Sequence, residues 1–439
     1  MSWQAEFEKK LVTPENAAKL VQPGWRVAFA LGGAEPKAFG DALAARRREI
    51  KDISVFVPVP RRDFGWYDSA NDEGSSITVG YLLPQWRERL GARVDYRITT
   101  LDYRFKAEHE RPEDHAPPDV YICEVSAPDD HGFCSFGAAR WDKKERLRAA
   151  RVGIAQINSK LIRTFGDNFV HISEVSHFLE DQPREARDPQ PPAIPEEVRK
   201  MAEFIKPLIR DGDTVQIGAG SATEPLASCG VFNGRNDLGL HTEFVAYGIV
   251  DLVRQGVFTG ARKTLHKGRM VATATGGTLR DLEFVHENPL FELYGHHYTH
   301  DIRTIAAHDN MVAIDNCLAV DLSGQITAES LGPRIMAGPG GQPAFAIGAL
   351  LSRGGRFISV LPSTATTAGG KVSRIVPRLP EGTVITIPRT VADYVVTEYG
   401  VAKLLGKTLR SRAEALIEIA HPDFRPELRN EGRKMFWGA

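Results

Sequence analysis

The stretch that decides the fold is residues 211–250, DGDTVQIGAGSATEPLASCGVFNGRNDLGLHTEFVAYGIV. It opens with a turn signal at 211–213, and the β-branched and apolar run at 214–217 predicts a strand. The small residues Gly218, Ala219, Gly220, Ser221 and Ala222 follow this strand. A loop of such residues allows a ligand to approach bare backbone N–H groups.

Further along the same stretch, Pro225 is typical of the first turn of a helix, and 238–242 predicts a second strand that carries Glu243 into the next loop. In parallel α/β sheets, ligands bind beyond the carboxyl ends of the strands. The loop at 218–222 and Glu243 would then face one crevice. The alternative is a tight strand-to-helix turn without a ligand, because the third glycine of a dinucleotide fingerprint is replaced by Thr223. In that alternative, Glu243 is a solvated surface acid.

The N-terminal part of the chain repeats this pattern. At one constant offset, Gly24, Val27, Phe29, Gly32 and Ala34 fall on Gly212, Val215, Ile217, Gly220 and Ala222. With a shift of one residue, Glu35-Pro36 falls on Glu224-Pro225, and each segment is preceded by a helix that starts at Pro-Glu (14–15 and 195–196). We interpret this as an internal duplication that produces two related α/β halves.

Short apolar runs and helical patterns alternate through both halves, which predicts mostly parallel sheets. Expected strands lie at 53–60, 94–98, 119–125, 152–158, 271–275, 311–315, 356–360 and 382–387. Expected helices lie at 1–22 (with Thr13 as a cap), 37–48, 142–150 and 409–420 (capped by Thr408). Expected loops lie at 104–118, 126–135 and 336–343.

The proline-rich, charged segment 181–195 is the predicted linker. The predicted domains are an N-terminal α/β domain, residues 1–180, and a C-terminal α/β domain, residues 196–439, that holds Glu243. A chain of 439 residues is also too long for a single core.

Composition narrows the functional classes. A net charge of −1 with 42% hydrophobic and 25% charged residues is ordinary for a globular protein and gives no electrostatic reason to expect nucleic-acid or membrane binding. We find no apolar run near the ~20 residues of a spanning helix and no secretory signal at the start. Four scattered cysteines indicate a reducing compartment, so we expect a cytoplasmic protein and, by the prior for such enzymes, a homo-oligomer.

Other polar groups allow two interpretations each. Five histidines crowd one region, namely His286, His296, His297, His300 and His308. Their spacing lacks a metal-binding pattern, so we expect a polar loop set and no metal. The basic cluster 260–269 is either a solvated face or a contact for phosphates, and Cys229 is expected to serve packing.

Several longer motifs resemble the acetyl-CoA hydrolase/transferase family, the coenzyme A transferase group that includes 4-hydroxybutyrate and butyryl-CoA:acetate CoA-transferases. The resemblance rests on Leu238–Phe244 and Gly248–Leu252, and on Ser126–Gly137, Gly166-Asp167, Lys263–His266, Ala328–Ser330, Gly338–Phe345, Ser373–Pro377, Val395–Gly400 and Ala420–Phe424. It covers nearly the whole chain and implies two related, open, mostly parallel α/β domains of the CoA-transferase type.

The resemblance also implies a mechanism of the class I type. Glu243 would attack an acyl-CoA thioester and pass through an anhydride to a glutamyl-CoA thioester, which an acceptor carboxylate then resolves. By the same resemblance, residues 218–222 contact CoA, and the loop with Gly338, Gly340 and Gly341 supplies oxyanion donors and CoA contacts. Acyl-CoA and a short- or medium-chain carboxylate are then substrates, with no permanently bound cofactor.

This sequence departs from the family pattern at two places. Ala246-Tyr247 stands where Ser-Asp is usual, and Ala368 stands where a CoA-contacting lysine is usual, with Lys371 as the nearest substitute. Two alternatives therefore stay open beside a CoA-transferase: an acyl-CoA hydrolase that uses the same glutamate, and a non-catalytic CoA- or metabolite-binding protein. Glu224 is expected to be structural, at the entry of a helix.

Overall fold

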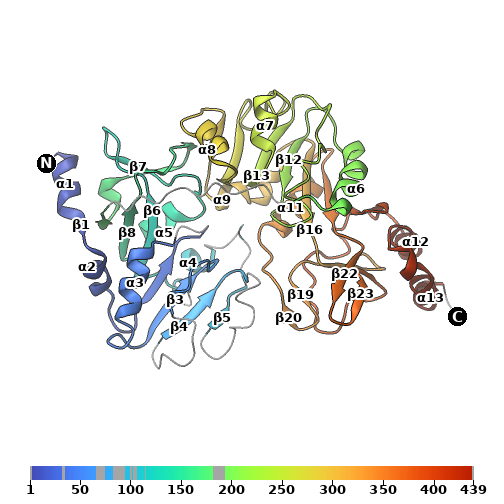
Figure 1. Cartoon of the computed structure of the whole chain (residues 1–439), viewed down its shortest axis with the longest axis horizontal. Coiled ribbons are helices and arrows are strands. Elements are labelled where there is room, and N and C mark those ends of the chain that lie inside the picture. The colour runs from blue at the N-terminus through green and yellow to red at the C-terminus, as the bar shows by residue number, and fades with distance from the viewer. Residues whose placement is uncertain are drawn as a thin grey trace. The chain divides into compact units, whose positions relative to one another are not determined.

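The computed structural model describes residues 2–31, 35–65, 75–82, 94–98, 101, 106–113, 115–180 and 193–437. The chain forms two compact units (Figure 1): the first takes in Met1–Arg187 and Leu282–His297, and the second takes in Asp188–Asp281 and Tyr298–Ala439. The predicted linker lies for the most part outside the described residues, so the domain boundary at 181–195 stays a prediction.

The first unit is built on a parallel sheet with the strand order β1-β11-β8-β6-β2-β3-β4-β5. Its strands are β1 (Leu11–Val12), β2 (Arg26–Phe29), β3 (Ile53–Val57), β4 (Ser75–Val79), β5 (Val94–Tyr96), β6 (Val120–Val125), β8 (Val152–Ile157) and β11 (His177–Leu179). Smaller pairs are β7 (Phe133–Ser135) with β10 (Phe169–His171), and β9 (Phe165–Gly166) with β15 (Phe291–Leu293). Its helices are α1 (Trp3–Lys10), α2 (Pro14–Lys19), α3 (Lys37–Ala45), α4 (Lys106–Glu110), α5 (Lys143–Ala149) and the 3-10 turn η3 (Ile172–Glu174).

The second unit has the order β26-β25-β21-β16-β12-β13-β14, parallel except for the β25–β26 hairpin. These strands are β12 (Thr214–Ile217), β13 (Gly239–Val245), β14 (Met270–Thr275), β16 (Met311–Asn316), β21 (Arg356–Val360), β25 (Tyr394–Thr397) and β26 (Gly400–Lys403). Short strands are β17 (Ala319–Asp321), β18 (Ile326–Thr327), β19 (Ser330–Leu331), β20 (Arg334–Ile335), β22 (Thr364–Thr367), β23 (Gly370–Ser373) and β24 (Ile375–Val376).

Helices of the second unit are α6 (Glu196–Ile205), α7 (Ile249–Arg254), α10 (Ile302–Ala306), α11 (Gln342–Leu351), α12 (Leu409–Glu418) and α13 (Arg425–Phe436), with the 3-10 turns η4 (Lys206–Leu208) and η5 (Pro422–Phe424). The division between the units falls within α8 (Leu279–Val285) and α9 (His296–Thr299). Among the described residues, no helix is both long and apolar enough to span a bilayer.

The two sheets share one topology. In each, the first long strand (β2 or β12) is central. The strands that follow it in the chain (β3 to β5, or β13 and β14) extend the sheet on one side, and later strands (β6, β8 and β11, or β16, β21, β25 and β26) extend it on the other side. The helices α2 and α6 both begin at the predicted Pro-Glu positions, after Thr13 and at Pro195. The predicted fold class of mostly parallel α/β sheets is therefore confirmed, and the matching strand orders support the duplication.

Several predicted elements differ from the structure. Residues 221–234 form consecutive turns instead of the helix expected from Pro225, and 382–387 makes only one bridge, at Ile387, instead of a strand. Val384 and Ile385 are 37% and 41% exposed, so that apolar run has no sheet partner to cover it. Two further differences are α4, which lies inside the loop expected at 104–118, and α13, which follows the helix that was expected to be the last.

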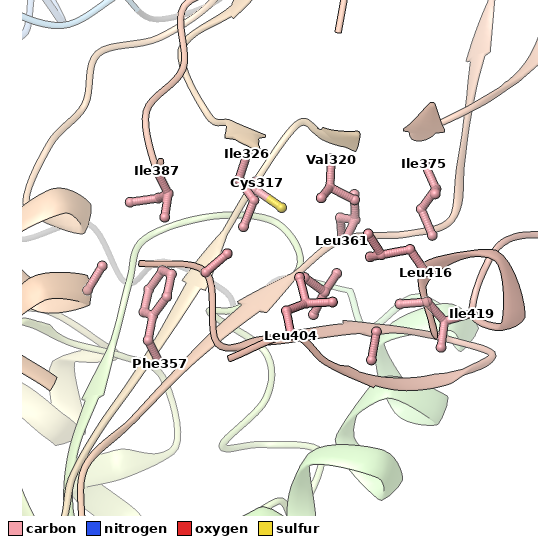
Figure 2. Packing of buried hydrophobic residues seen from close by; sticks show 14 of the residues in the cluster. Cys317, Val320, Ile326, Phe357, Leu361, Ile375, Ile387, Leu404, Leu416 and Ile419 are labelled. Carbon is pink, nitrogen blue, oxygen red and sulfur yellow. The ribbon is translucent and has the colours of Figure 1, made fainter. Parts of the chain in front are cut away.

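The core of the second unit packs the later strands against α11 and α12. Figure 2 shows part of this cluster, with Cys317, Phe357, Leu361 and Leu416 among its buried side chains. Cys317 follows β16 directly. The packed core therefore fixes the carboxyl end of β16, which borders the candidate site.

Candidate active site

Glu243 lies inside β13, not in the loop after it as the sequence predicted. The strand continues because Phe244 and Val245 still pair with Ala274 and Thr275 of β14. The Glu243 side chain is 20% exposed. The carboxylate therefore reaches the surface from a rigid strand near the carboxyl edge of the sheet.

A histidine holds one oxygen of this carboxylate. His300 Nε2 lies 2.9 Å from Glu243 Oε2, and the imidazole is fully buried. On the other side of the ring, Nδ1 lies 2.9 Å from the hydroxyl of Thr299, which is hydrogen-bonded in turn to the hydroxyl of Thr273 on β14. A carboxylate oxygen only accepts, so Nε2 must carry the proton. The hydroxyl pair on the other nitrogen fits this tautomer and fixes the ring.

The start of α11 meets the same oxygen. Gly341 is the N-cap of α11, and a Cβ placed on it would lie 2.6 Å from Glu243 Oε2 and 2.7 Å from His300 Nε2. Gly340 has φ +56, in the left-handed region that favours glycine. The positive end of the helix dipole and its unpaired N–H groups favour negative charge at this place. The structure thus brings Gly341 to Glu243, and the oxyanion role of this loop stays a prediction. Gly338 lies in the same loop.

The loop at 218–222 is partly closed by its own hydrogen bonds. Gly218 N donates to Ile314 O at 2.8 Å, and Gly220 N donates to Glu224 Oε1 at 3.1 Å. Within the described part of the chain, the backbone N–H groups of Ala219, Ser221 and Ala222 have no assigned acceptor. A ligand at this loop would therefore meet these three amides and not the two glycine amides.

Neighbouring side chains leave no room for a side chain at either glycine of this loop. A Cβ on Gly218 would lie 2.0 Å from Asp315 Oδ1, and one on Gly220 would lie 2.8 Å from Asn316 Cβ. Glu224 is structural, as expected, but it binds the loop and does not start a helix.

Asp315 is the second acid of this site and was not predicted. It lies at the end of β16, is 4% exposed, and its Oδ1 accepts a hydrogen bond of 3.0 Å from Gln216 Nε2. Burial first, and the charge of Glu243 to a smaller extent, raise the pKa of this carboxyl to about 7, against the lowering effect of the Gln216 amide. The site therefore pairs a glutamate that has a hydrogen-bond donor from His300 with a buried aspartic acid whose pKa is raised.

The other polar residues of this region are structural. His241 and His308 are buried with ring centroids 4.6 Å apart; burial keeps the pKa of His241 well below its usual value and lowers that of His308 to about 3. Lys263 of the basic cluster is 1% exposed and donates to the carbonyls of Leu240 and Arg269. It is thus neither a solvated nor a phosphate-binding residue. Among the described residues, no group of three or more His, Cys, Asp or Glu could hold a metal.

Two other predicted residues are not joined to this group by any contact in the described part of the chain. Lys371 lies on the exposed β22–β23 hairpin, where it pairs with Thr366. Cys229 is a half-buried free thiol whose pKa is raised by burial, which does not suit a nucleophile. Tyr247, two residues after the end of β13, is half-buried, and its effect on acyl specificity stays a prediction.

Sequence reasoning missed the functional positions of His300 and Asp315. His300 stood out only as one of five crowded histidines, and Asp315 only as the last residue of a predicted strand. The available signal was positional, because an acid at the carboxyl end of a central parallel strand lies at the ligand edge of the sheet.

The chain is an α/β protein of two units with one topology, and its second unit carries a half-buried carboxylate on a central strand beside a helix N-terminus. The family model of the acetyl-CoA hydrolase/transferase C-terminal domain matches residues 277–432. The 4-hydroxybutyrate coenzyme A transferase of Clostridium kluyveri is 37% identical over 441 residues, which cover 99% of this chain and 100% of that protein. The chain belongs to the acetyl-CoA hydrolase/transferase family, and it is an enzyme of the CoA-transferase group.

Two further comparisons agree with this assignment. The butyryl-CoA:acetate CoA-transferase of Anaerostipes caccae is 33% identical over 453 residues, covering 99% of this chain and 98% of that protein. The crystal structure of RipA from Yersinia pestis superimposes with a TM-score of 0.89 at 32% identity and covers 99% of each chain.

Proposed function

We propose that this protein transfers coenzyme A between an acyl-CoA and a short- or medium-chain carboxylate, with Glu243 as the covalent nucleophile. The single observation that carries the proposal is the Glu243 carboxylate, with one oxygen held by His300 and the start of α11 beside it. Acetate is the acceptor class we would test first, because one relative is named for butyryl-CoA and acetate.

The chemistry starts at the oxygen that His300 does not hold. Glu243 Oε1 attacks the thioester carbon, the C–S bond breaks, and the CoA thiolate leaves an acyl-glutamyl anhydride. The thiolate then attacks the glutamyl carbonyl carbon, which releases the first carboxylate and forms a glutamyl-CoA thioester. An acceptor carboxylate attacks this thioester and displaces the thiolate, which attacks the acceptor's acyl carbon and frees Glu243. Each step exchanges bonds of similar reactivity, so no step needs a cofactor.

Three kinds of group support these steps. The Nε2–H of His300 keeps Oε2 in place, which leaves the other oxygen as the attacking atom. The Gly340–Gly341 amides at the start of α11 would donate to the oxyanions that form. The N–H groups of Ala219, Ser221 and Ala222 are the donors that the 218–222 loop still offers to CoA, with Lys371 a further proposed contact. We also propose a cytoplasmic homo-oligomer without a permanently bound cofactor.

The family name also covers hydrolases, and one assay separates the two activities. Free thiol release from acyl-CoA is measured with and without added acetate. A transferase releases thiol slowly without an acceptor but exchanges labelled acetate rapidly into acyl-CoA. Rapid release without acetate would identify a hydrolase.

The decisive experiment is Glu243→Gln. This change keeps the shape of the side chain and an oxygen for His300, but it removes the nucleophile, so labelled-acetate exchange should fall by roughly 10⁴-fold or more. Borohydride should trap a glutamyl-CoA thioester in the wild type only. The matched control is Asp393→Asn, which should exchange normally. Asp393 is a buried acid that accepts a hydrogen bond of 3.1 Å from Phe357 N on the amino side of β21. Normal exchange by Glu243→Gln would refute the assignment.

A further inference from the structure

Two acids flank the same glycine in the second unit. Ile217 pairs with Ile314, so the next residues, Gly218 and Asp315, come side by side. On the other side of β12, Val215 pairs with Leu240, and Ile217 N donates to Thr242 Oγ1 at 3.4 Å, so the next residues, Gly218 and Glu243, follow on from neighbouring strands. Paired residues of neighbouring parallel strands point to the same face of the sheet. The two carboxyl groups are therefore separated by a single strand that has no side chain at this position.

The space above Gly218 is filled by the Asp315 carboxyl. A Cβ on Gly218 would lie only 2.0 Å from Asp315 Oδ1, so the acid occupies the place of the missing side chain. Its Oδ1 accepts from Gln216, two residues earlier on β12. Within the described part of the chain, Oδ2 is buried without a hydrogen-bond partner and Asp315 forms no ion pair. A bare carboxylate oxygen in this position would be costly, whereas a hydroxyl is not charged.

We propose that Asp315 is a positioning residue that acts as a neutral carboxylic acid, so that Glu243 carries the only negative charge between β13 and β16 during transfer. This inference rests on the proposed function, because it gives Asp315 a role in the reaction of Glu243. The Asp315 side chain controls the field at the nucleophile and does not itself react.

The chemical reason lies in the charges that pass through the site. Attack by Glu243 creates an oxyanion at the acyl carbonyl, and both the displaced thiolate and the acceptor carboxylate are anions. A second fixed negative charge one strand away would raise the energy of each of these species. A neutral Asp315 avoids this, and its loss of a proton would slow the transfer without any change in shape.

The groups around Asp315 support this interpretation. They are Glu243 on β13, Gln216 on β12, the paired Ser359 on β21, and the Cys317 thiol, whose pKa burial raises to about 12 and which Arg374 faces. Of these, only Gln216 favours ionisation of Asp315, and burial and Glu243 both oppose it, which places the pKa at about 7. His300 donates to Glu243 and so keeps the negative charge there.

The test is the pH dependence of kcat/KM for exchange between acyl-CoA and labelled acetate. The wild type should lose activity as the pH rises through about 7 and Asp315 ionises, and the rate should level off at a lower value once Asp315 is charged. Asp315→Asn keeps a neutral side chain of the same shape, so its rate at pH 6 should stay within about fivefold of the wild type and its alkaline decline should disappear. Asp393→Asn is the control and should keep the decline.

In a second variant, the alkaline decline of kcat/KM should shift to another pH and not disappear. Gln216→Met removes the amide that favours ionisation, so the decline should shift to higher pH. A residue with only a packing role would lower the rate at every pH and leave the shape of the profile unchanged. An unchanged alkaline decline in Asp315→Asn overturns the proposal.

Infrared spectroscopy tests the protonation state of Asp315 independently of the proposed function. The wild-type minus Asp315→Asn difference spectrum at pH 6 should contain the carbonyl band of a protonated carboxylic acid. If that band is present but no acyl-CoA and carboxylate pair exchanges, the proposed function fails while the neutral acid stands. If the difference spectrum at pH 6 contains instead the bands of an ionised carboxylate, the Asp315 proposal is refuted, whatever the transfer activity.

Discussion

Two buried charged groups, Arg146 in the first unit and Asp315 in the second, have different surroundings. In the first unit, Arg146 is 3% exposed and donates to Asp142 at 2.7 Å and to Glu108 at 2.9 Å, so each charge has an opposite partner. In the second unit, Asp315 is equally buried but has only an amide donor. The sheets share one strand order, so the topology does not cause the difference.

The comparison separates two uses of a buried acid. Ion pairing in the first unit balances the cost of desolvation and gives a group that stays charged, which suits a structural role. Leaving Asp315 unpaired beside Glu243 moves its pKa to about 7, close to the pH at which an enzyme works. Unpaired buried acids at the carboxyl edge of a sheet are therefore the better candidates for function.

The largest effect on stability is expected from breaking the paired group. Arg146→Met leaves Asp142 and Glu108 buried without their cation, so the free energy of unfolding should fall by about 3–5 kcal/mol. Chemical denaturation monitored by circular dichroism measures this change, and the exchange rate per folded molecule should be nearly unchanged. A loss below 1 kcal/mol would contradict a paired, structural role.

A smaller but more local effect is expected at the nucleophile. In Gly341→Ala, the new methyl group would come within 2.6 Å of Glu243 Oε2 and push the carboxylate or His300 aside. We expect kcat to fall by about 10²-fold, as for a misplacement of about 1 Å, while the melting temperature changes little. Gly369→Ala on the β22–β23 hairpin is the control, because its methyl group would meet only Thr367 Oγ1, at 3.7 Å. Equal rates for the two variants would show that Gly341 does not position Glu243.

Stability should also depend on pH through Asp315. The folded-state pKa of about 7 lies above the ordinary value of 3.8, so the native state binds this proton more tightly than the unfolded chain. The resulting stabilisation is complete below pH 3.8 and is lost as the pH rises to about 7; it corresponds to at most roughly 4 kcal/mol. Asp315→Asn lacks this titration, so its stability relative to the wild type should rise between pH 4 and pH 8 by up to roughly 4 kcal/mol. A difference that is independent of pH would contradict the assigned shift.

The smallest effect is expected at Thr273, three hydrogen bonds away from the nucleophile. Thr273→Val removes the hydroxyl that pairs with Thr299 and so loosens the ring of His300. Exchange should slow by about tenfold or less, in line with one neutral hydrogen bond of about 1 kcal/mol. Thr275→Val, a buried change on the same strand, is the control. A loss as large as that of Gly341→Ala would mean that the hydroxyl chain does more than orient the ring.

The sequence by itself determined the repeated pattern of β-branched runs, glycine turns and Pro-Glu helix starts, because periodicity and turn chemistry are local properties. It therefore predicted the mostly parallel α/β class, the central strand at 214–217 with its repeat around Val27 and Phe29, and a family motif that contains Glu243. It misjudged 221–234 and 382–387, where the outcome depends on whether distant segments supply hydrogen-bond partners.

Only the tertiary structure decided which side chains meet at Glu243. His300 and Asp315 lie 57 and 72 residues further along the chain, and strand pairing and the chain after α9 bring them to one edge of the sheet. The tertiary structure also decided why Gly218 is a glycine, since the carboxyl of Asp315 occupies its side-chain position. Long-range packing sets burial and partner choice, and these fix whether an acid is charged; no local pattern contains that information.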